Sequence, residues 1–190
     1  MPPYAHYGTR FNERRHVLEE NARESAHGNA APYVWASVRI ALGVIFFWAF
    51  IDKVWGLGYS TKPENAWIAG GNPTLGYLNS SVGPFADFFK AMAGDPITNL
   101  LFMGGLAAIG AALLTGIGVR IAAYGGALMM SFMYLSHVPW AGTTTNPIVD
   151  DHVVYGLLLV GLTFVHAGRR LGLGGWWGTT SLVRRHPILE

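Results

Sequence analysis

The sequence predicts an all-α polytopic membrane protein, built as a bundle of four transmembrane helices with short amphipathic helices in its first external loop. One observation is a set of four apolar stretches, at residues 34–55, 97–118, 121–139 and 153–167. Each is close to the roughly 20 apolar residues that a helix needs to cross the hydrocarbon core of a bilayer.

The second observation is the segregation of ten arginines from three lysines. The arginines lie before or early in the first stretch, between the second and third, and after the fourth, whereas the lysines lie at the end of the first stretch or in the following loop. Cytoplasmic flanks of membrane helices are enriched in basic residues, and the arginines therefore place both termini inside. The predicted location is the cell inner (plasma) membrane, crossed several times.

The predicted organisation has three parts: a cytoplasmic tail at residues 1–32, a membrane domain at 33–170 with its external loop at 56–96, and a cytoplasmic tail at 171–190. The net charge of +2 is explained by the cytoplasmic arginines, so no nucleic-acid partner is expected. The chain has no cysteine, which excludes a thiolate nucleophile and a cysteine-held iron–sulfur cluster in this chain.

The first predicted span carries one cation near each end. The preceding tail can form a short surface helix that Gly28 and Pro32 would end. Arg39 and Lys53 are fourteen residues apart, which returns to within about 40° of the same helix face, roughly 21 Å along the axis. These cations either face the protein interior or snorkel to the headgroups.

The external loop contains two proline-started segments. One short helix is predicted from Pro73 through Leu78. A second begins at Pro84 and places an apolar set on one face, namely Phe85, Phe88, Phe89 and Met92. This amphipathic segment is expected to lie at the outer interface, either covering the bundle mouth or gating a substrate.

The second and third spans are joined by few residues around 118–120, which predicts a tight antiparallel hairpin. Small residues recur every fourth position on both spans, as Gly104, Ala108, Ala112 and Gly116, and as Ala123, Ala127 and Ser131. Such stripes let helices approach closely in lipid.

Polar residues gather at the outer ends of the third and fourth spans. They are Tyr134, His137, Trp140, Asn146, Asp150, Asp151, His152 and Tyr155, at the predicted level of Asp52 and Lys53. A titrating histidine beside carboxylates and a lysine can move protons to or from a bound quinone headgroup. Alternatively, the aspartates cap the fourth helix and the histidines are interfacial.

Neither a haem nor a metal is expected at this cluster. His137 and His152 could ligate a haem iron, but they lie at the rim rather than in a bundle core. Asp150, Asp151 and His152 are three adjacent residues without convergent partners, a weak metal signal.

Three segments of the sequence carry a resemblance to known proteins. They are Arg39-Ile-Ala-Leu-Gly43-Val-Ile-Phe46 followed by Lys53, the hairpin Leu114-Thr-Gly-Ile-Gly-Val-Arg120-Ile-Ala-Ala, and Asn146-Pro-Ile-Val-Asp-Asp-His152. Together they resemble the DoxX/DoxD family of small four-helix membrane proteins. The resemblance covers roughly residues 33–178, and the external segments 70–78 and 83–89 look closer to DoxD, the small subunit of thiosulfate:quinone oxidoreductase. It implies a membrane subunit linked to quinone and to sulfur or oxidative-stress chemistry, working with an extracytoplasmic redox or sulfur-handling protein.

From these residues we expect a quinone or lipid-like ligand near the outer face. Lys53, Asp151 and His152 are the candidates for proton or anion handling, Tyr134, His137 and Trp140 for lining the site, and Arg39 for an inner electrostatic anchor. Asp52, Asn146 and Tyr155 complete the candidate ligand-binding set.

The alternative is a non-enzymatic scaffold that anchors a redox or respiratory partner in the bilayer, and the sequence leaves open whether the chain is an enzyme. Glycine-rich faces also permit a homo-oligomer. A small-solute transporter is disfavoured because spans two to four contain no Asp, Glu, Lys or Arg to mark a polar path.

Overall fold

The computed structural model describes residues 5–141 and 146–189, with side chains described from residue 30 onward. Throughout these residues the regular elements are helical and no strand occurs, which confirms the predicted all-α class. The long helices are α1 (Ala5–Trp55), α4 (Pro96–Thr115), α5 (Val119–Ser136) and α6 (Asp151–Leu162). The short ones are α2 (Leu75–Asn79), α3 (Ala86–Ala91), α7 (Gly174–Trp177) and α8 (Ser181–Arg185). Isolated 3₁₀ turns connect them, including Ala167–Arg169 after α6.

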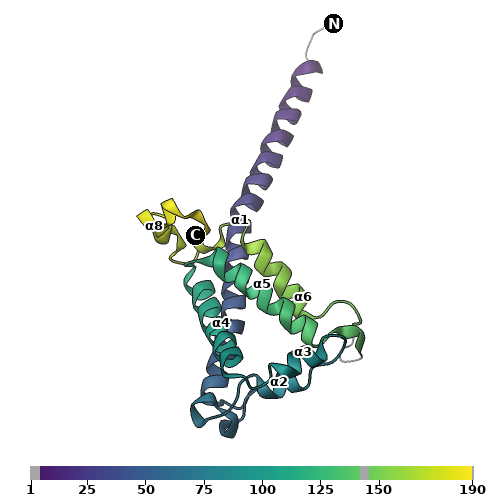
Figure 1. Cartoon of the computed structure of the whole chain (residues 1–190). Helices are drawn as coiled ribbons and strands as arrows, with labels where there is room; N and C mark the ends of the chain where they lie inside the picture. The colour runs from purple at the N-terminus through teal and green to yellow at the C-terminus, as the bar shows by residue number, and fades with distance from the viewer. Residues whose placement is uncertain (1–4, 142–145, 190) are drawn as a thin grey trace.

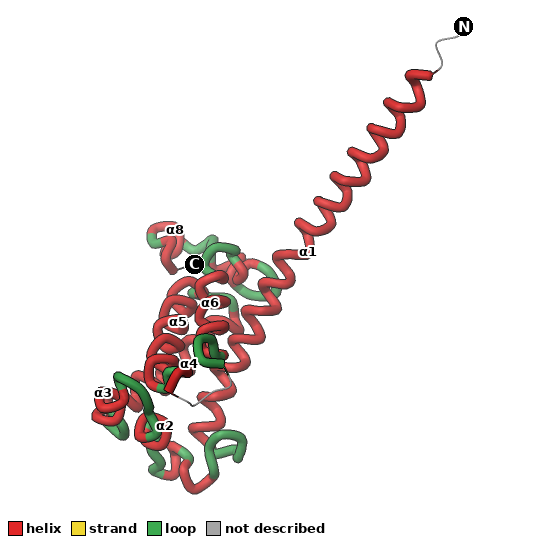
Figure 2. The backbone as a smooth tube through the Cα atoms, turned by 90° about the vertical axis from the view of Figure 1, so that its right-hand side faces the viewer, coloured by secondary structure: helices red, strands yellow, loops and turns green. Residues whose placement is uncertain are grey.

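Helix α1 is longer than the sequence predicts. It runs without interruption through Gly28 and Pro32, and its N-terminal part projects beyond the bundle (Figures 1 and 2). The expected break is wrong because a proline costs a helix about 3 kcal/mol without forcing it to end, and Ala30 and Ala31 beside it are strong helix formers.

Two helical segments are long and apolar enough to cross a membrane, Ala30–Trp55 and Pro96–Thr115. Helix α5 has 18 residues and ends at Ser136, three residues before the predicted boundary. Helix α6 has only 12 residues, about 18 Å at 1.5 Å per residue. It ends at Leu162 because the chain turns there, and His166 has a left-handed φ of 47°. The structure thus supports two of the four predicted spans by length and composition.

The bundle consists of two closely packed pairs, α1 with α4 and α5 with α6. Glycines make the first contact possible. A Cβ at Gly43 would lie 2.9 Å from the Leu114 nitrogen, and one at Gly110 would lie 2.6 Å from the Phe47 nitrogen. Phe46 packs into the buried core that the four long helices share.

The two ends of the bundle differ. At one, which we call the loop end, α1 ends, α4 begins, and α2 and α3 lie across the bundle (Figure 1). At the other, the terminal end, α4 turns into α5 and the segment 171–189 folds back onto the bundle (Figure 1). This segment is held on the bundle by hydrogen bonds from the Leu173 nitrogen to the Thr115 carbonyl (2.7 Å) and from the Arg120 guanidinium to the Pro187 carbonyl (3.2 Å). The predicted C-terminal tail is therefore structured.

Helices α2 and α3 lie where the two proline-started segments predict short helices. Of the predicted apolar face of α3, Phe89 is buried, whereas Phe85 is 46% and Phe88 60% exposed, so only part of that face packs on the bundle. The chain after α2 is joined to the end of α5 by a hydrogen bond from the Val82 nitrogen to the Ser136 carbonyl (3.0 Å).

Candidate functional site

A large hollow lies between α4 and α5. The two helices share the short turn at residues 116–118 and diverge towards α2 and α3 (Figure 1). The space between them has a volume of about 700 Å³. It extends from Thr98 to Ala112 along α4, a distance of about 21 Å at 1.5 Å per residue.

The walls of this cavity are almost entirely apolar. Helix α4 contributes Leu101, Phe102 and Ile109, and α5 contributes Met129, Phe132 and Met133. Phe88, Phe89 and Met92, on and just after α3, close the loop end. A long slot with apolar walls and a closed polar end suits an amphiphile with a chain and a compact headgroup.

The predicted close contact between the small-residue stripes is not what the structure shows. A Cβ added at Gly104 would meet nothing within 4 Å, and Ala108 and Ala112 line the cavity. Of the glycines in and just after α4, Gly110 meets the α1 backbone, and Gly116, the last member of the predicted stripe and the C-cap of α4, meets the backbone of Gly168 rather than that of α5.

Polar groups in the cavity wall lie at the loop end, and Lys53 is the one charged residue among the described lining residues. Its side chain comes from the last turn of α1. Within the described residues no carboxylate lies within ion-pair distance of its ammonium group. A half-buried cation of this kind can be satisfied by an anionic or carbonyl headgroup.

Tyr77 and Ser136 add hydroxyls to the same end of the cavity. The Tyr77 phenol donates to the Met133 carbonyl at 3.3 Å, and the Ser136 hydroxyl donates to the same carbonyl at 2.7 Å. Burial raises the pKa of the Tyr77 phenol above its usual value. The phenol is therefore neutral at physiological pH and remains a hydrogen-bond donor.

His137 connects this wall of the cavity to the surface. It follows the last residue of α5, and its Nδ1 lies 3.0 Å from the Ser136 hydroxyl while its Nε2 lies 3.2 Å from the exposed Ser80 hydroxyl. Its ring packs against the Tyr77 ring, with centroids 4.5 Å apart. Burial, and then the neighbouring His152, lower the pKa of His137. A mostly neutral imidazole with both nitrogens in contact with hydroxyls can accept a proton on one side and release one on the other.

Asp150, Asp151 and His152 form the N-terminus of α6 nearby. Asp150 accepts a hydrogen bond from the Val153 nitrogen at 3.2 Å, which confirms that one aspartate caps this helix. His152 Nδ1 lies 2.8 Å from the Asp150 carboxylate and 3.6 Å from that of Asp151. One ligand atom from each residue lies within 4.8 Å of the others, but capping and the histidine–aspartate hydrogen bond already account for this geometry.

The other candidate residues serve the loops. The Asp52 carboxylate is buried and accepts hydrogen bonds from the Ser60 hydroxyl (2.7 Å) and the Ser60 nitrogen (3.0 Å). Tyr134 donates to the Ile148 carbonyl at 2.9 Å and packs against Trp140. The Asn146 side chain accepts from the nitrogens of the two residues after Pro147.

Arg39 lies at the opposite, terminal end of the bundle. It is completely buried, and its guanidinium donates to the carbonyls of Leu113, Leu114, Arg170 and Leu171. The first two belong to the last turn of α4, whose carbonyls have no partner within the helix. Arg39 therefore ties α1 to the end of α4 and to the chain after α6.

Of the ten candidate residues, Lys53 alone lines the cavity, and His137 is one hydrogen bond away from it. Tyr77 and Ser136 are not among the residues that the sequence predicts, because neither pattern nor spacing brings the first external loop to the end of α5. The apolar face of α3 was the available signal for the closed end of the cavity.

Fold and site together define an all-helical protein with two helices able to cross a membrane and an apolar cavity between its second and third long helices, as far as the chain is described. No protein-family model, curated protein or solved structure matches the chain.

Proposed function

We propose that this protein is a four-span membrane subunit, related to the DoxX/DoxD family that its motifs resemble, which binds a quinone between α4 and α5. The loop end is then extracytoplasmic and both termini are cytoplasmic. The observation that carries the proposal is the long apolar cavity whose polar end holds Lys53 and Tyr77. The isoprenoid chain would lie along the slot, with the quinone ring at the loop end.

The described residues support a distinct role for each polar group. The Lys53 ammonium is a donor suited to one carbonyl oxygen of a quinone, and the Tyr77 phenol would donate to the other after turning away from the Met133 carbonyl, which it meets at 3.3 Å. Both also stabilise the negative charge that appears on these oxygens during reduction. His137 would supply protons through Ser136, and be recharged from the surface on its Ser80 side, with His152 and its aspartates beside it.

The reaction must balance. Reduction of a quinone to a quinol takes two electrons and two protons, and the protons would arrive from the extracytoplasmic side through His137. The chain has no cysteine, and we assign the electrons to a small sulfur species or to a redox protein that docks at the loop end. That donor is oxidised by two electrons in each turnover.

The test is purification in a mild detergent followed by mass spectrometry of bound quinone and co-eluting proteins. Two glycine substitutions form a matched pair, because a Cβ at either position meets nothing within 4 Å, yet Gly125 lines the cavity and Gly104 does not. We expect Gly125→Leu to remove bound quinone and Gly104→Leu to retain it. Equal quinone in both variants, or none in the unaltered protein, would refute the cavity as a quinone site.

Proton handling has its own test. His152→Ala and His137→Ala should each lower quinone reduction while leaving bound quinone at the level of the unaltered protein. Unchanged turnover in both variants would exclude the histidines as proton carriers.

A scaffold that docks a partner is the second candidate, favoured by the apolar side chains exposed at the loop end. Trp140 is 59% exposed, Ile148 69% and Ile68 68%. If docking is the whole function, Trp140→Ser with Ile148→Ser should release the co-purifying partner, and Gly125→Leu should have no effect on the phenotype.

A further inference from the structure

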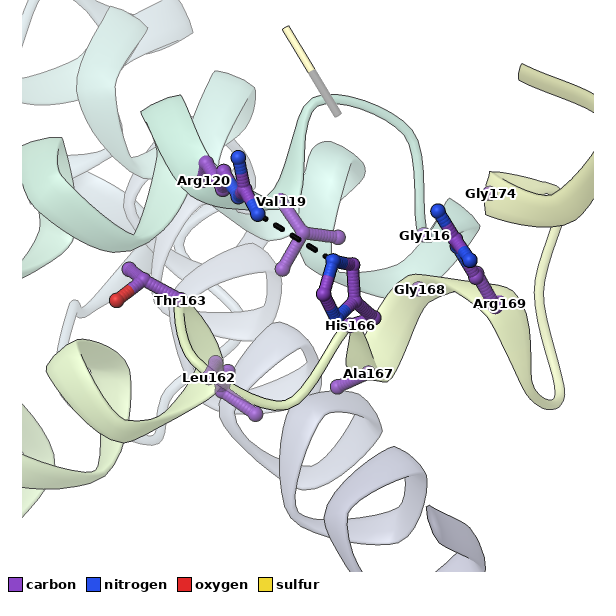
Figure 3. A pocket seen from close by; sticks show the side chains of 10 residues that line it. All are labelled: Gly116, Val119, Arg120, Leu162, Thr163, His166, Ala167, Gly168, Arg169 and Gly174. Atoms are coloured by element: carbon purple, nitrogen blue, oxygen red, sulfur yellow. Dashed lines mark hydrogen bonds between the residues drawn. The ribbon is translucent and has the colours of Figure 1, made fainter. Parts of the chain in front are cut away.

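A second hollow lies at the terminal end (Figure 3). Its lining residues Gly116 and Val119 adjoin Gly118, which lines the inner end of the cavity. Its floor contains three glycines, Gly116, Gly168 and Gly174, which pack so closely that a Cβ at Gly174 would lie 2.5 Å from the Gly168 carbonyl oxygen. Because these three residues are glycines, none of them places a side chain in the hollow. The hollow has a volume of only about 10 Å³, enough for a single oxygen atom or water molecule.

Three basic side chains surround the hollow. Arg120 at the start of α5 and His166 after α6 point towards each other, and Arg169 stands on the other side beside Gly116 and Gly174 (Figure 3). The Arg120 guanidinium lies 3.4 Å from His166 Nε2, and Arg120 is the donor because a guanidinium has no acceptor. His166 also adopts the left-handed φ of 47°, which is uncommon for a residue with a side chain.

The charge of this end is positive among the described side chains. Every described acidic side chain belongs to the loop end: Asp52, Glu64, Asp87, Asp95, Asp150 and Asp151. The terminal end carries Arg39, Arg120, Arg169, Arg170, Arg184 and Arg185. Among the described side chains, this surplus of cations favours an anion at the terminal end.

Apolar side chains beside the hollow are exposed. Leu173 is 53% exposed and Trp176 63% exposed, in the segment that begins α7, and Phe164 is 75% exposed between α6 and the hollow. Tryptophan with aliphatic neighbours is typical of the level where lipid headgroups meet acyl chains. Basic pockets at the cytoplasmic ends of membrane helices are suited to anionic headgroups.

We propose that the hollow between Arg120, His166 and Arg169 binds the phosphate group of an anionic phospholipid, with one phosphate oxygen in the hollow and the acyl chains beside Trp176 and Leu173. This site rests on the membrane placement in the proposed function but not on the quinone, so each can fail without the other. It would fix the position of the 171–189 segment on the inner leaflet.

The experiment uses the purified full chain in a neutral detergent, with its seven tryptophans reporting thermal unfolding. Phosphatidylglycerol, phosphatidylcholine and inorganic phosphate are added separately. We expect phosphatidylglycerol near 100 times its dissociation constant to raise the midpoint by about 5 to 10 °C. Phosphatidylcholine should have a much smaller effect. A shift with inorganic phosphate as large as that with the lipid would overturn the lipid site and show that the hollow takes free phosphate.

The matched variants each remove two positive charges from the same end. Arg120→Gln with Arg169→Gln should abolish most of the shift, whereas Arg184→Gln with Arg185→Gln should retain it, because neither of the latter residues lines the hollow. Arg120 also donates to the Pro187 carbonyl at 3.2 Å, so Arg169→Gln alone serves as a second variant if the double variant does not fold. Equal shifts with both lipids, or equal loss in both double variants, would overturn the site in favour of diffuse attraction.

Discussion

The two faces of α4 differ in how closely they are packed. On the α1 side, Gly110 brings the backbones so close that a Cβ would lie 2.6 Å from the Phe47 nitrogen. On the α5 side, Gly105, Ala108 and Ala112 border a cavity of about 700 Å³. Small residues on one helix therefore serve close packing on one face and leave room for a ligand on the other.

Helix α5 is held at its two ends, and it also meets α4 in mid-helix, where a Cβ at Gly105 would lie 2.5 Å from Met129 Cε. At the terminal end the glycine turn at residues 116–118 joins the helices directly. At the loop end α5 is joined to the chain of α2 through Tyr77 and Val82, with Phe89 of α3 in the space between. The α1–α4 contact can therefore be disturbed separately from the cavity, and the following changes exploit this difference.

The largest effect is expected at Arg39, which holds α1 against the end of α4. Arg39→Met leaves four carbonyls at the terminal end without their donor, and we expect a loss of about 3 kcal/mol in the free energy of unfolding. The measurement is reversible unfolding in detergent. Lys53→Met, which removes the cation at the other end of this span, is the control and should change stability much less.

Gly110→Ala tests the close contact itself. The added methyl group must displace the Phe47 backbone, and we expect a loss of about 1 to 3 kcal/mol in the free energy of unfolding. Gly104→Ala is the matched control because its Cβ meets nothing, and it should stabilise the helix by about 0.5 to 1 kcal/mol. Similar losses for both would mean that α1 and α4 are not packed as described.

Lys53→Met tests ligand binding in the cavity, and we expect it to have little effect on folding. We expect quinone affinity to fall about tenfold, which corresponds to about 1.4 kcal/mol, because the headgroup loses its cationic donor. Lys53→Arg should retain most of the affinity. Titration with a short-chain quinone measures both, and an unchanged affinity in Lys53→Met would remove this residue from the site.

The smallest effect concerns His137 and pH. Its pKa is lower in the folded protein than in the unfolded chain, chiefly because of burial. Between these two pKa values the unfolded chain binds more protons, so stability is full above the unfolded value and declines as pH falls towards the folded value. We expect the thermal midpoint of His137→Gln to fall less between about pH 7.5 and 5.5 than that of the unaltered protein. His186→Gln, at an exposed position, should leave the decline intact.

The sequence predicted the local structure well wherever one property decided it. Long apolar runs identified α1 and α4 as candidate spans, proline-started segments located α2 and α3, and one of the two aspartates expected to cap α6, Asp150, does so. It was wrong at Gly28 and Pro32, where flanking helix formers outweigh the breakers, and at the end of α6, where a turn begins early. The quinone, the partner and the family remain predictions.

What the sequence by itself determined is the helical class, the candidate spans and the separation of arginines from lysines, because these depend on local composition and periodicity. Only the tertiary structure decided which glycines are contacts and which border open space, and which polar residues share a site. Tyr77 and Ser136 meet, although 59 positions separate them, because α2 packs against the end of α5. Arg39 joins α1 to two other chain segments at the terminal end because the end of α4 and the chain after α6 both present carbonyls to its guanidinium. No local sequence pattern encodes the meeting of these segments.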